Sequence, residues 1–256
     1  MLQTGLIAHY SQHQHLHAKM PSILSKDKTQ MQNISTLLFD LDGTLVDSAP
    51  DLAAAVNQTL TQLNLNTYSE QQIRTWVGNG AKVLIERALS GSQQIDPNLD
   101  TALANDALTL FLNNYQENVC VHSKLYQGVA PTLAKLKDTG YTLAIVTNKP
   151  EKFIQPILEK LQIAEFFAAS LGGDSLPEKK PSPQPLLHIC QQLNAKVENT
   201  IMIGDSHNDI LAAKAANMQS IGLTYGYNYG EDINKHKPEW VFENFADIAE
   251  LLLKSE

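Results

Sequence analysis

The stretch that decides the fold is residues 36–44, Thr-Leu-Leu-Phe-Asp-Leu-Asp-Gly-Thr. Its first four residues form an apolar run rich in β-formers, which predicts a short buried strand. Two carboxylates, Asp40 and Asp42, follow where this strand would end. Open α/β sheets bind ligands at the carboxyl ends of their strands, so both aspartates can face one cleft. Gly43 permits an unusual backbone turn directly beside them.

A pair of neighbouring aspartates suggests a cation. The two carboxylates repel each other unless a positive charge lies between them, and hard oxygen ligands of this kind suit Mg²⁺. An isolated Asp-x-Asp pair is nevertheless a weak signal, because many such pairs are turn or capping residues. The interpretation therefore depends on what the rest of the chain contributes.

Outward from this stretch, apolar runs and helix-like stretches alternate. Further strand-like runs occur at 142–146, 166–171, 200–203, 219–223 and, more weakly, 240–242. Helix-like stretches lie between most of them, at 129–138, 151–161, 183–193 and 209–216. Alternation at this spacing predicts βαβ units and a parallel sheet with helices on both faces. The strands are continuous runs, as expected where both faces of a sheet are buried.

One interval breaks the alternation. Residues 49–121 contain no convincing strand, and helical stretches fill them at 50–63, 70–89 and 99–117, the second interrupted at Gly78 and Gly80. We therefore expect an inserted helical domain at 49–121, and a catalytic core made of 35–48 and 122–256. Residues 1–34 lack periodicity, and we expect a disordered extension there or an over-long gene model that should begin at Met20 or Met31.

Composition narrows the class of partner. The net charge is -8 and no basic run occurs, which argues against nucleic acid or an anionic membrane surface. A small anionic substrate is compatible with this charge, because a metal ion and local cations can invert the field inside a pocket. Cys120 and Cys190 are far apart in the sequence, so reduced thiols are expected. No apolar stretch approaches the roughly 18 residues of a membrane span, and we expect a cytoplasmic protein.

A second acidic cluster follows the run at 200–203. Residues 204–209 read Gly-Asp-Ser-His-Asn-Asp, so Asp205 ends a strand and Asp209 lies four residues later. Both can face the cleft if a helix begins between them. Ser206 or Asn208 can instead serve as an ordinary N-cap of that helix, which leaves Asp205 unexplained.

Two further strand ends carry weaker signals. Thr147 and Asn148 follow the run at 142–146, where a hydroxyl and backbone N–H groups can donate to phosphate oxygens. The alternative is turn chemistry ahead of Lys149-Pro150. Lys180 lies just before a predicted helix and can neutralise phosphate charge, although a solvated basic loop is the usual fate of a lysine pair. Four modest signals at four strand ends are together much stronger than any one.

In this order, the motifs at 40–47, 147–148, 180–181 and 204–209 resemble the four signature motifs of the haloacid dehalogenase superfamily, from residue 36 to the C-terminus. The resemblance implies a Rossmann-like parallel-sheet α/β core with a helical cap inserted after the first motif. Further matches at 47–50, 76–81, 146–150 and 222–230 are similar to bacterial phosphoglycolate phosphatases. The extension before Ile34 has no counterpart in that pattern.

The resemblance also implies roles for individual residues. Asp40 would be the nucleophile, Asp42 the proton donor and acceptor, and Lys180 the cation that stabilises the nucleophile and the phosphate. Mg²⁺ would be held by Asp40, by the backbone carbonyl of Asp42 and by Asp205. Phosphate and substrate contacts would come from Thr147, Asn148 and Gly43, orientation from Asp209 and Ser206, and substrate recognition by the cap from Asn79, Lys82 or Arg74.

We thus expect Mg²⁺-dependent hydrolysis of 2-phosphoglycolate to glycolate and phosphate. Within the same fold, the sequence leaves open a phosphatase for another small ester, such as a sugar phosphate or N-acetylmuramic acid 6-phosphate, and a phosphosugar mutase. A non-catalytic binding module is a more distant alternative, because a pure binder has no need of intact acidic motifs at every strand end. The sequence does not predict the oligomeric state.

Overall fold

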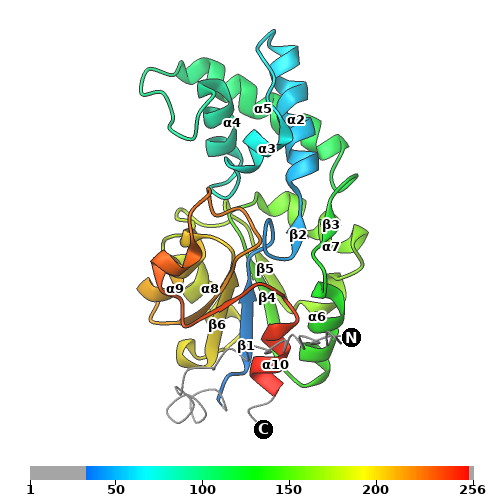
Figure 1. The fold of residues 1–256 in the computed structure, drawn as a ribbon, viewed down its shortest axis with the longest axis vertical. Helices are drawn as coiled ribbons and strands as arrows, with labels where there is room; N and C mark the ends of the chain where they lie inside the picture. The colour runs from blue at the N-terminus through cyan, green and yellow to red at the C-terminus, as the bar shows by residue number, and fades with distance from the viewer. Residues whose placement is uncertain (1–32, 254–256) are drawn as a thin grey trace, which may run out of the picture.

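The structure is a computed structural model that describes residues 33–253; the extension expected at 1–34 lies almost entirely outside the described residues. Figure 1 shows a sheet flanked by helices in its lower part and a separate group of helices above it. The first regular element along the described residues is β1 (Thr36–Phe39), which is a strand of this sheet.

Six parallel strands form the sheet, in the spatial order β5-β4-β1-β6-β7-β8. Their bounds are β4 Thr142–Val146, β5 Ala169–Leu171, β6 Thr200–Gly204, β7 Gln219–Leu223 and β8 Trp240–Phe242. All four residues of β1 are buried, and β1 lies between β4 and β6. The predicted α/β class with a parallel sheet is confirmed.

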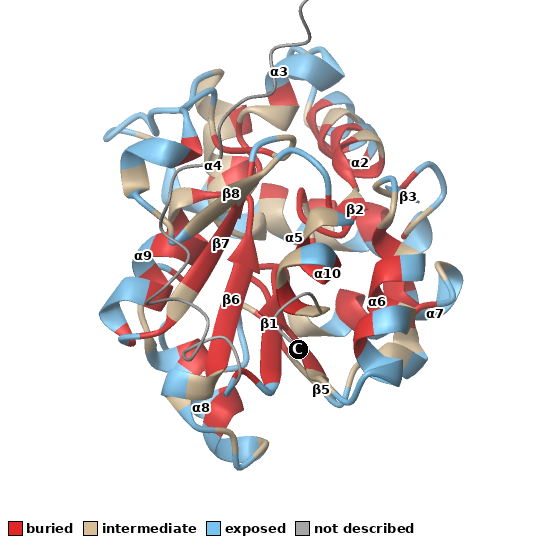
Figure 2. Cartoon of the chain, turned by 60° about the horizontal axis from the view of Figure 1, so that its bottom comes forward, coloured by how far each residue is buried: buried red, intermediate tan, exposed pale blue. Residues whose placement is uncertain are grey.

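Helices cover both faces of the sheet, as the red buried strands of Figure 2 show. Alternate residues of β1 face opposite layers: Leu37 and Phe39 belong to one apolar cluster and Leu38 to the other. The first cluster includes residues of α6 (Val129–Asp138), α7 (Ile154–Lys160) and α10 (Asp247–Leu253), and the second includes residues of α8 (Gln184–Gln192) and α9 (His207–Ala215).

Most differences from the predicted elements are at element ends. The run predicted as a strand at 166–171 begins as a 3-10 turn, η2 (Ala164–Phe166), before β5. The stretch predicted as one helix at 151–161 is likewise divided into η1 (Glu151–Phe153) and α7. Apolar runs of this length do not distinguish a short turn from the first residues of a strand, and Phe166 N donates to Ile163 O at 3.2 Å to close the turn.

The upper group of helices, which we call the helical unit, contains four helices. They are α2 (Ala49–Gln62), α3 (Glu70–Arg74), α4 (Ala81–Ser90) and α5 (Thr101–Glu117). Asp100 caps α5 by accepting from Ala102 N at 2.8 Å. The helical unit packs around buried aromatic rings, among them Phe111 and Tyr115, whose centroids are 5.8 Å apart. Within residues 33–253, no helix has both the length and the apolar character required to cross a membrane.

Two short strands connect the helical unit to the sheet. β2 (Val46–Asp47) leads into α2, β3 (Lys124–Leu125) leads back from α5, and the two pair antiparallel. The carboxylate of Asp51 in α2 accepts from His122 N and Ser123 N, each at 2.8 Å. This pair of strands was not predicted, because two residues are too few to give a periodic signal. The chain therefore leaves and rejoins the core at one place.

Candidate active site

The sheet brings the motif residues together at one edge. From β1 the chain passes to β4 on one side of β1 and later to β6 on the other, so the strand order reverses at β1. Ligands in open α/β sheets bind outside the carboxyl ends of the strands at such a point. Asp40 follows β1, Thr147 follows β4 and Asp205 follows β6.

Three carboxylates meet at this edge, and two of them contact one ammonium group. Asp40, Asp205 and Asp209 are buried, and each offers an oxygen within 4.8 Å of the others. Lys180 Nζ lies 2.6 Å from Asp209 Oδ1 and 3.2 Å from Asp40 Oδ1. It also donates to Val146 O at 2.5 Å, and the lysine is 1% exposed. The lysine pair of the sequence is therefore split, since Lys180 is enclosed in the site.

The electrostatics of the cluster favour an additional cation. Burial raises the pKa of Asp40 to about 6, against the opposing effect of Lys180. Burial, followed by repulsion from Asp40 and Asp209, raises the pKa of Asp205 well above its usual value. Burial by itself would lower the pKa of Lys180, but Asp209 and Asp40 raise it. Three carboxylates that share a single ammonium group, which contacts two of them, fit a divalent ion such as Mg²⁺.

Two glycines allow the acidic groups to approach the backbone closely. Gly43 has a φ of +87°, and a Cβ there would lie 2.3 Å from Asp205 Oδ2. A Cβ on Gly204 would lie 2.2 Å from Asp209 Cγ. Any side chain at either position would collide with a buried carboxylate. The glycine of the first motif therefore contributes by making room for the aspartate of another strand.

Hydrogen bonds fix the orientation of the second acidic cluster. Asp205 accepts from Thr44 Oγ1 at 2.7 Å and from Tyr227 N at 2.5 Å. Asp209 Oδ2 accepts from Ser206 Oγ at 2.8 Å and from Ser206 N at 3.1 Å, which completes a capping box at the start of α9. Helix capping and site formation are thus carried out by the same residues. Asp209 holds Lys180 with its other oxygen.

The side chain of Asp42 has a partner that the sequence analysis did not assign to the site. Lys149 Nζ lies 3.0 Å from Asp42 Oδ1 and 3.1 Å from Oδ2, and Lys149 is 4% exposed. Ser48 Oγ donates to Asp42 Oδ1 at 2.6 Å. From the sequence, Lys149 was predicted only as part of a turn with Pro150. A lysine directly after a strand-end Thr-Asn pair was the available signal.

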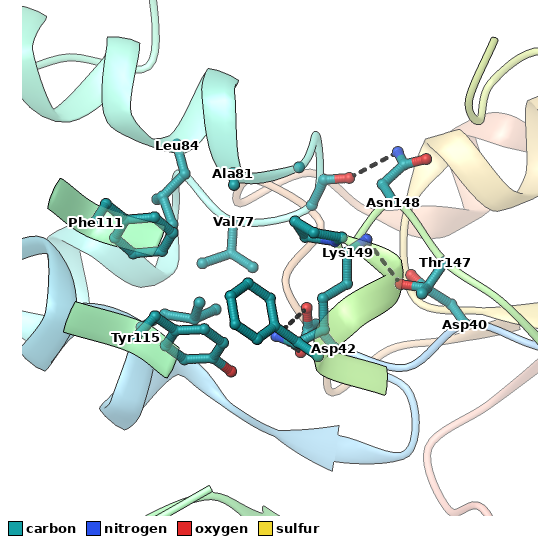
Figure 3. Close-up of a pocket in the computed structure, with 15 residues that line it drawn as sticks. Asp40, Asp42, Val77, Ala81, Leu84, Phe111, Tyr115, Thr147, Asn148 and Lys149 are labelled. Carbon is teal, nitrogen blue, oxygen red and sulfur yellow. Dashed lines mark hydrogen bonds and ion pairs between the residues drawn. The ribbon is translucent and has the colours of Figure 1, made fainter. Parts of the chain in front are cut away.

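A pocket opens between this edge and the helical unit (Figure 3). The core contributes polar groups from Asp40, Asp42 and 147–149, together with Pro150 and Phe153. The helical unit and the loops joining its helices contribute a mainly apolar wall, made of Leu52, Val77, Gly78, Gly80, Ala81, Leu84, Phe111 and Tyr115. The amide of Asn148 connects the two parts by donating to Gly78 O at 3.0 Å.

The polar residues expected to act from the helical unit lie outside this lining. The side chain of Lys82 is 64% exposed and pairs with Glu86 at 3.2 Å. Asn79 Nδ2 lies 3.4 Å from Asn208 Oδ1. Arg74 forms an ion pair with Asp47 at 2.7 Å. In this structure, the loop between α3 and α4 reaches the pocket through Val77, Gly78 and Gly80 rather than through these side chains.

Comparison with known proteins agrees with this geometry. The haloacid dehalogenase-like hydrolase family matches residues 37–223. A phosphoglycolate phosphatase of Colwellia psychrerythraea is 59% identical over 86% of this chain and 97% of its own length. One from Vibrio cholerae is 46% identical over 88% of this chain and all of its own length.

A solved structure has a similar fold. The crystal structure of a predicted phosphoglycolate phosphatase from Haemophilus somnus superposes with a TM-score of 0.80 at 44% identity, and covers 86% of this chain and 98% of that chain. The family match spans the acidic clusters, the lysine and the strand-end threonine. The chain therefore belongs to the haloacid dehalogenase-like hydrolase family.

Proposed function

We propose that this enzyme hydrolyses 2-phosphoglycolate to glycolate and phosphate, with Mg²⁺ as cofactor and an aspartyl phosphate on Asp40 as intermediate. The observation that carries the proposal is the assembly of Asp40, Asp205 and Lys180 at one sheet edge, with Asp42 in the adjoining pocket. Relatives that match this chain over most of their length are named phosphoglycolate phosphatases.

The first step forms the intermediate. A carboxylate oxygen of Asp40 attacks phosphorus in line, and the bond from phosphorus to the ester oxygen breaks. Asp42 gives its proton to the departing glycolate oxygen. Asp42 then takes a proton from a water molecule whose oxygen attacks phosphorus, which releases phosphate and regenerates Asp40. One carboxyl group thus serves first as acid and then as base.

Charge stabilisation is the main requirement of such a transfer. Mg²⁺, held by Asp40, the backbone carbonyl of Asp42 and Asp205, would offset the repulsion between the carboxylate and the phosphate. Lys180 faces Asp40 and is kept in place by Asp209, whose other oxygen is held by Ser206. The Thr147 hydroxyl and the backbone N–H of Asn148 would donate to the phosphoryl oxygens, beside the turn at Gly43.

The helical unit would act as the cap that covers the substrate and excludes water. Its pocket wall is largely apolar, so it offers few partners for the hydroxyl groups of a sugar. This favours a small ester over a sugar phosphate. The proposal includes a cap at 49–121, a cytoplasmic location, and a small phosphorylated substrate as partner without nucleic acid or membrane.

The test is phosphate release from 2-phosphoglycolate in the presence of Mg²⁺, beside a panel of sugar phosphates and nucleotides. Preference for 2-phosphoglycolate by roughly 100-fold in kcat/KM is expected. Equal or faster turnover of another ester would preserve the reaction type and remove the proposed substrate. Absence of turnover on every ester would favour a binding module instead.

A further inference from the structure

We propose that Lys149 forms a carboxylate-binding subsite, in which its ammonium group leaves Asp42 to bind the carboxylate of the substrate. The inference rests on the proposed function, since it concerns the group that distinguishes phosphoglycolate from a simple alkyl phosphate. It assigns a substrate contact to the core strand edge rather than to the polar side chains of the helical unit.

The ammonium group of Lys149 is buried. Lys149 is 4% exposed, and its ammonium group contacts both carboxylate oxygens of Asp42 and lies 4.7 Å from the centre of the Tyr115 ring. A buried ammonium is costly unless an anion compensates it. Asp42 supplies that anion in the structure, and a substrate carboxylate that replaces Asp42 would supply the same compensation.

Lysine and arginine are scarce in the lining of the pocket. Among the described residues that line the pocket, Lys149 is the only lysine or arginine. Lys180 is bonded to Asp209 and Val146 O at the acidic cluster, and Arg74 is bonded to Asp47. An anionic group that enters the pocket alongside the apolar wall therefore meets Lys149 as the cation of the lining.

The carboxylate of the proposed substrate lies close to the reacting ester oxygen. In 2-phosphoglycolate a single methylene separates the ester oxygen from the carboxylate. Asp42 has to reach that ester oxygen to protonate it. A cation in contact with Asp42 is consequently within reach of the carboxylate next to the same oxygen, provided that phosphorus faces Asp40. Lys149 follows Thr147 by two residues, and the backbone N–H of Lys149 donates to Thr147 Oγ1 at 3.2 Å.

A tyrosine hydroxyl lies on the opposite wall of the pocket. The hydroxyl of Tyr115 is buried beside the Lys149 ammonium group and donates to none of the described residues. Figure 3 shows it facing the same space as Lys149 and Asp42. A carboxylate held by Lys149 can accept from this hydroxyl, which would connect the core to the helical unit through the substrate.

Exchange of partners gives the subsite a second effect. In the structure Lys149 holds Asp42 through both carboxylate oxygens. Once Lys149 turns to the substrate carboxylate, Ser48 is the side chain among residues 33–253 that still holds Asp42, which can then rotate towards the ester oxygen. Recognition of the carboxylate would thus release the acid, and an ester without a carboxylate would leave the ion pair closed. Asp42 is a carboxylate while Lys149 pairs with it, so after the exchange it takes up a proton from solvent and then serves as the acid.

The experiment compares two esters in two variants. The kcat/KM is measured for 2-phosphoglycolate and for 2-hydroxyethyl phosphate, which replaces the carboxylate by a neutral CH₂OH group. We expect Lys149→Met to lower kcat/KM for 2-phosphoglycolate by roughly 100-fold. For 2-hydroxyethyl phosphate the variant should not lower kcat/KM, because the ion pair that otherwise holds Asp42 is absent from it. The matched control is Lys152→Met, because Lys152 is exposed and contacts Gln116 at 3.3 Å outside the lining; it should leave both values unchanged.

The outcomes separate the two proposals. Wild-type protein that does not hydrolyse 2-phosphoglycolate would contradict the proposed function before any variant is made. Wild-type activity on 2-phosphoglycolate, combined with an equal loss on both esters in Lys149→Met, would overturn the subsite and leave Lys149 as a residue that only holds Asp42. If the methionine variant does not fold, Lys149→Gln and Lys149→Arg are compared: the arginine should retain the preference for the carboxylate, and the glutamine should lose it.

Discussion

The two sides of the pocket differ in how their residues are held. On the core side, Asp205, Asp209 and Lys180 are each fixed by at least two polar contacts, most of them to the backbone or to other motif residues. On the side of the helical unit, Leu84 and Phe111 are held by packing alone. Polar contacts define positions within narrow limits, whereas packed apolar surfaces tolerate repacking. The core side is therefore suited to chemistry and to charged contacts with the substrate, and the other side to selection by substrate size.

The largest expected effect is on the core side, at the nucleophile. Asp40→Asn should lower kcat for 2-phosphoglycolate by roughly 10⁵-fold, because no other group is placed to form the covalent intermediate. Phosphate release at saturating substrate measures it. The folded state should survive the change, since the substitution removes a buried charge. Activity retained in Asp40→Asn would place the nucleophile elsewhere and break the comparison.

The lysines of the core provide a sharper test, since Lys179 and Lys180 are neighbours with different surroundings. Lys180→Met should lower kcat by roughly 10³-fold, because the carboxylates around Asp40 would lose their ammonium group. Lys179→Met is the matched control: Lys179 donates to Asn79 O at 2.6 Å and touches neither Asp40 nor Asp209. Its kcat should change by less than about 5-fold. Similar losses in both variants would indicate a general electrostatic effect.

The charge of the core side also predicts a dependence of stability on pH. The folded-state pKa of Asp40 is raised from 3.8 to about 6, so protonated Asp40 stabilises the metal-free protein below about pH 4, and this contribution is lost as pH rises through about 6. The loss from this group is about 3 kcal/mol. Mg²⁺ should counteract it, and so the rise in Tm on adding Mg²⁺ should be larger at about pH 7.5 than at about pH 5.

Asp40→Asn provides the control for this measurement. The asparagine does not titrate, so the Tm of the metal-free variant should fall less between about pH 5 and pH 7.5 than that of the wild type. Thermal unfolding followed by circular dichroism, with a chelator present, gives both values. Identical pH profiles for the two proteins would show that Asp40 does not carry this charge effect.

The smallest effect on chemistry is expected at the apolar wall. Leu84→Ala should change kcat for 2-phosphoglycolate by less than about 10-fold while lowering stability by roughly 2–4 kcal/mol, because Leu84 is 3% exposed. Relative turnover of bulkier esters should increase, since the pocket is enlarged. Denaturant unfolding and kcat/KM across a size series of esters measure the two effects. A loss of kcat comparable to that of Lys180→Met would show that the wall takes part in chemistry.

The sequence was informative where its signals are local. The strand at 36–39 and Asp40 directly after it are adjacent in the chain, so composition and spacing predicted both. The four motif positions were also predicted, because parallel strands bring their carboxyl ends to one edge. The pairing of β2 with β3 was not visible, since each strand contributes two residues.

Contacts between distant segments account for the rest. The ion pair of Lys149 with Asp42 joins positions 107 residues apart, and no pattern near either residue announces it. The same holds for Tyr115, which faces Lys149 from a stretch predicted only as helical. The predicted contribution of Asn79 or Lys82 assumed that polar side chains of a loop point into the cleft; the structure brings the loop's glycines there instead.

The pairing of β2 with β3 has a consequence for how such proteins diversify. Since Val46 lies opposite Leu125 and Asp47 opposite Lys124, the ends of the whole helical unit are neighbours on the core surface. A segment with adjoining ends can be lengthened, shortened or exchanged between related genes without shifting any strand of the six-stranded sheet. New substrate ranges can then arise by recombination at this junction, while the chemical apparatus is inherited intact.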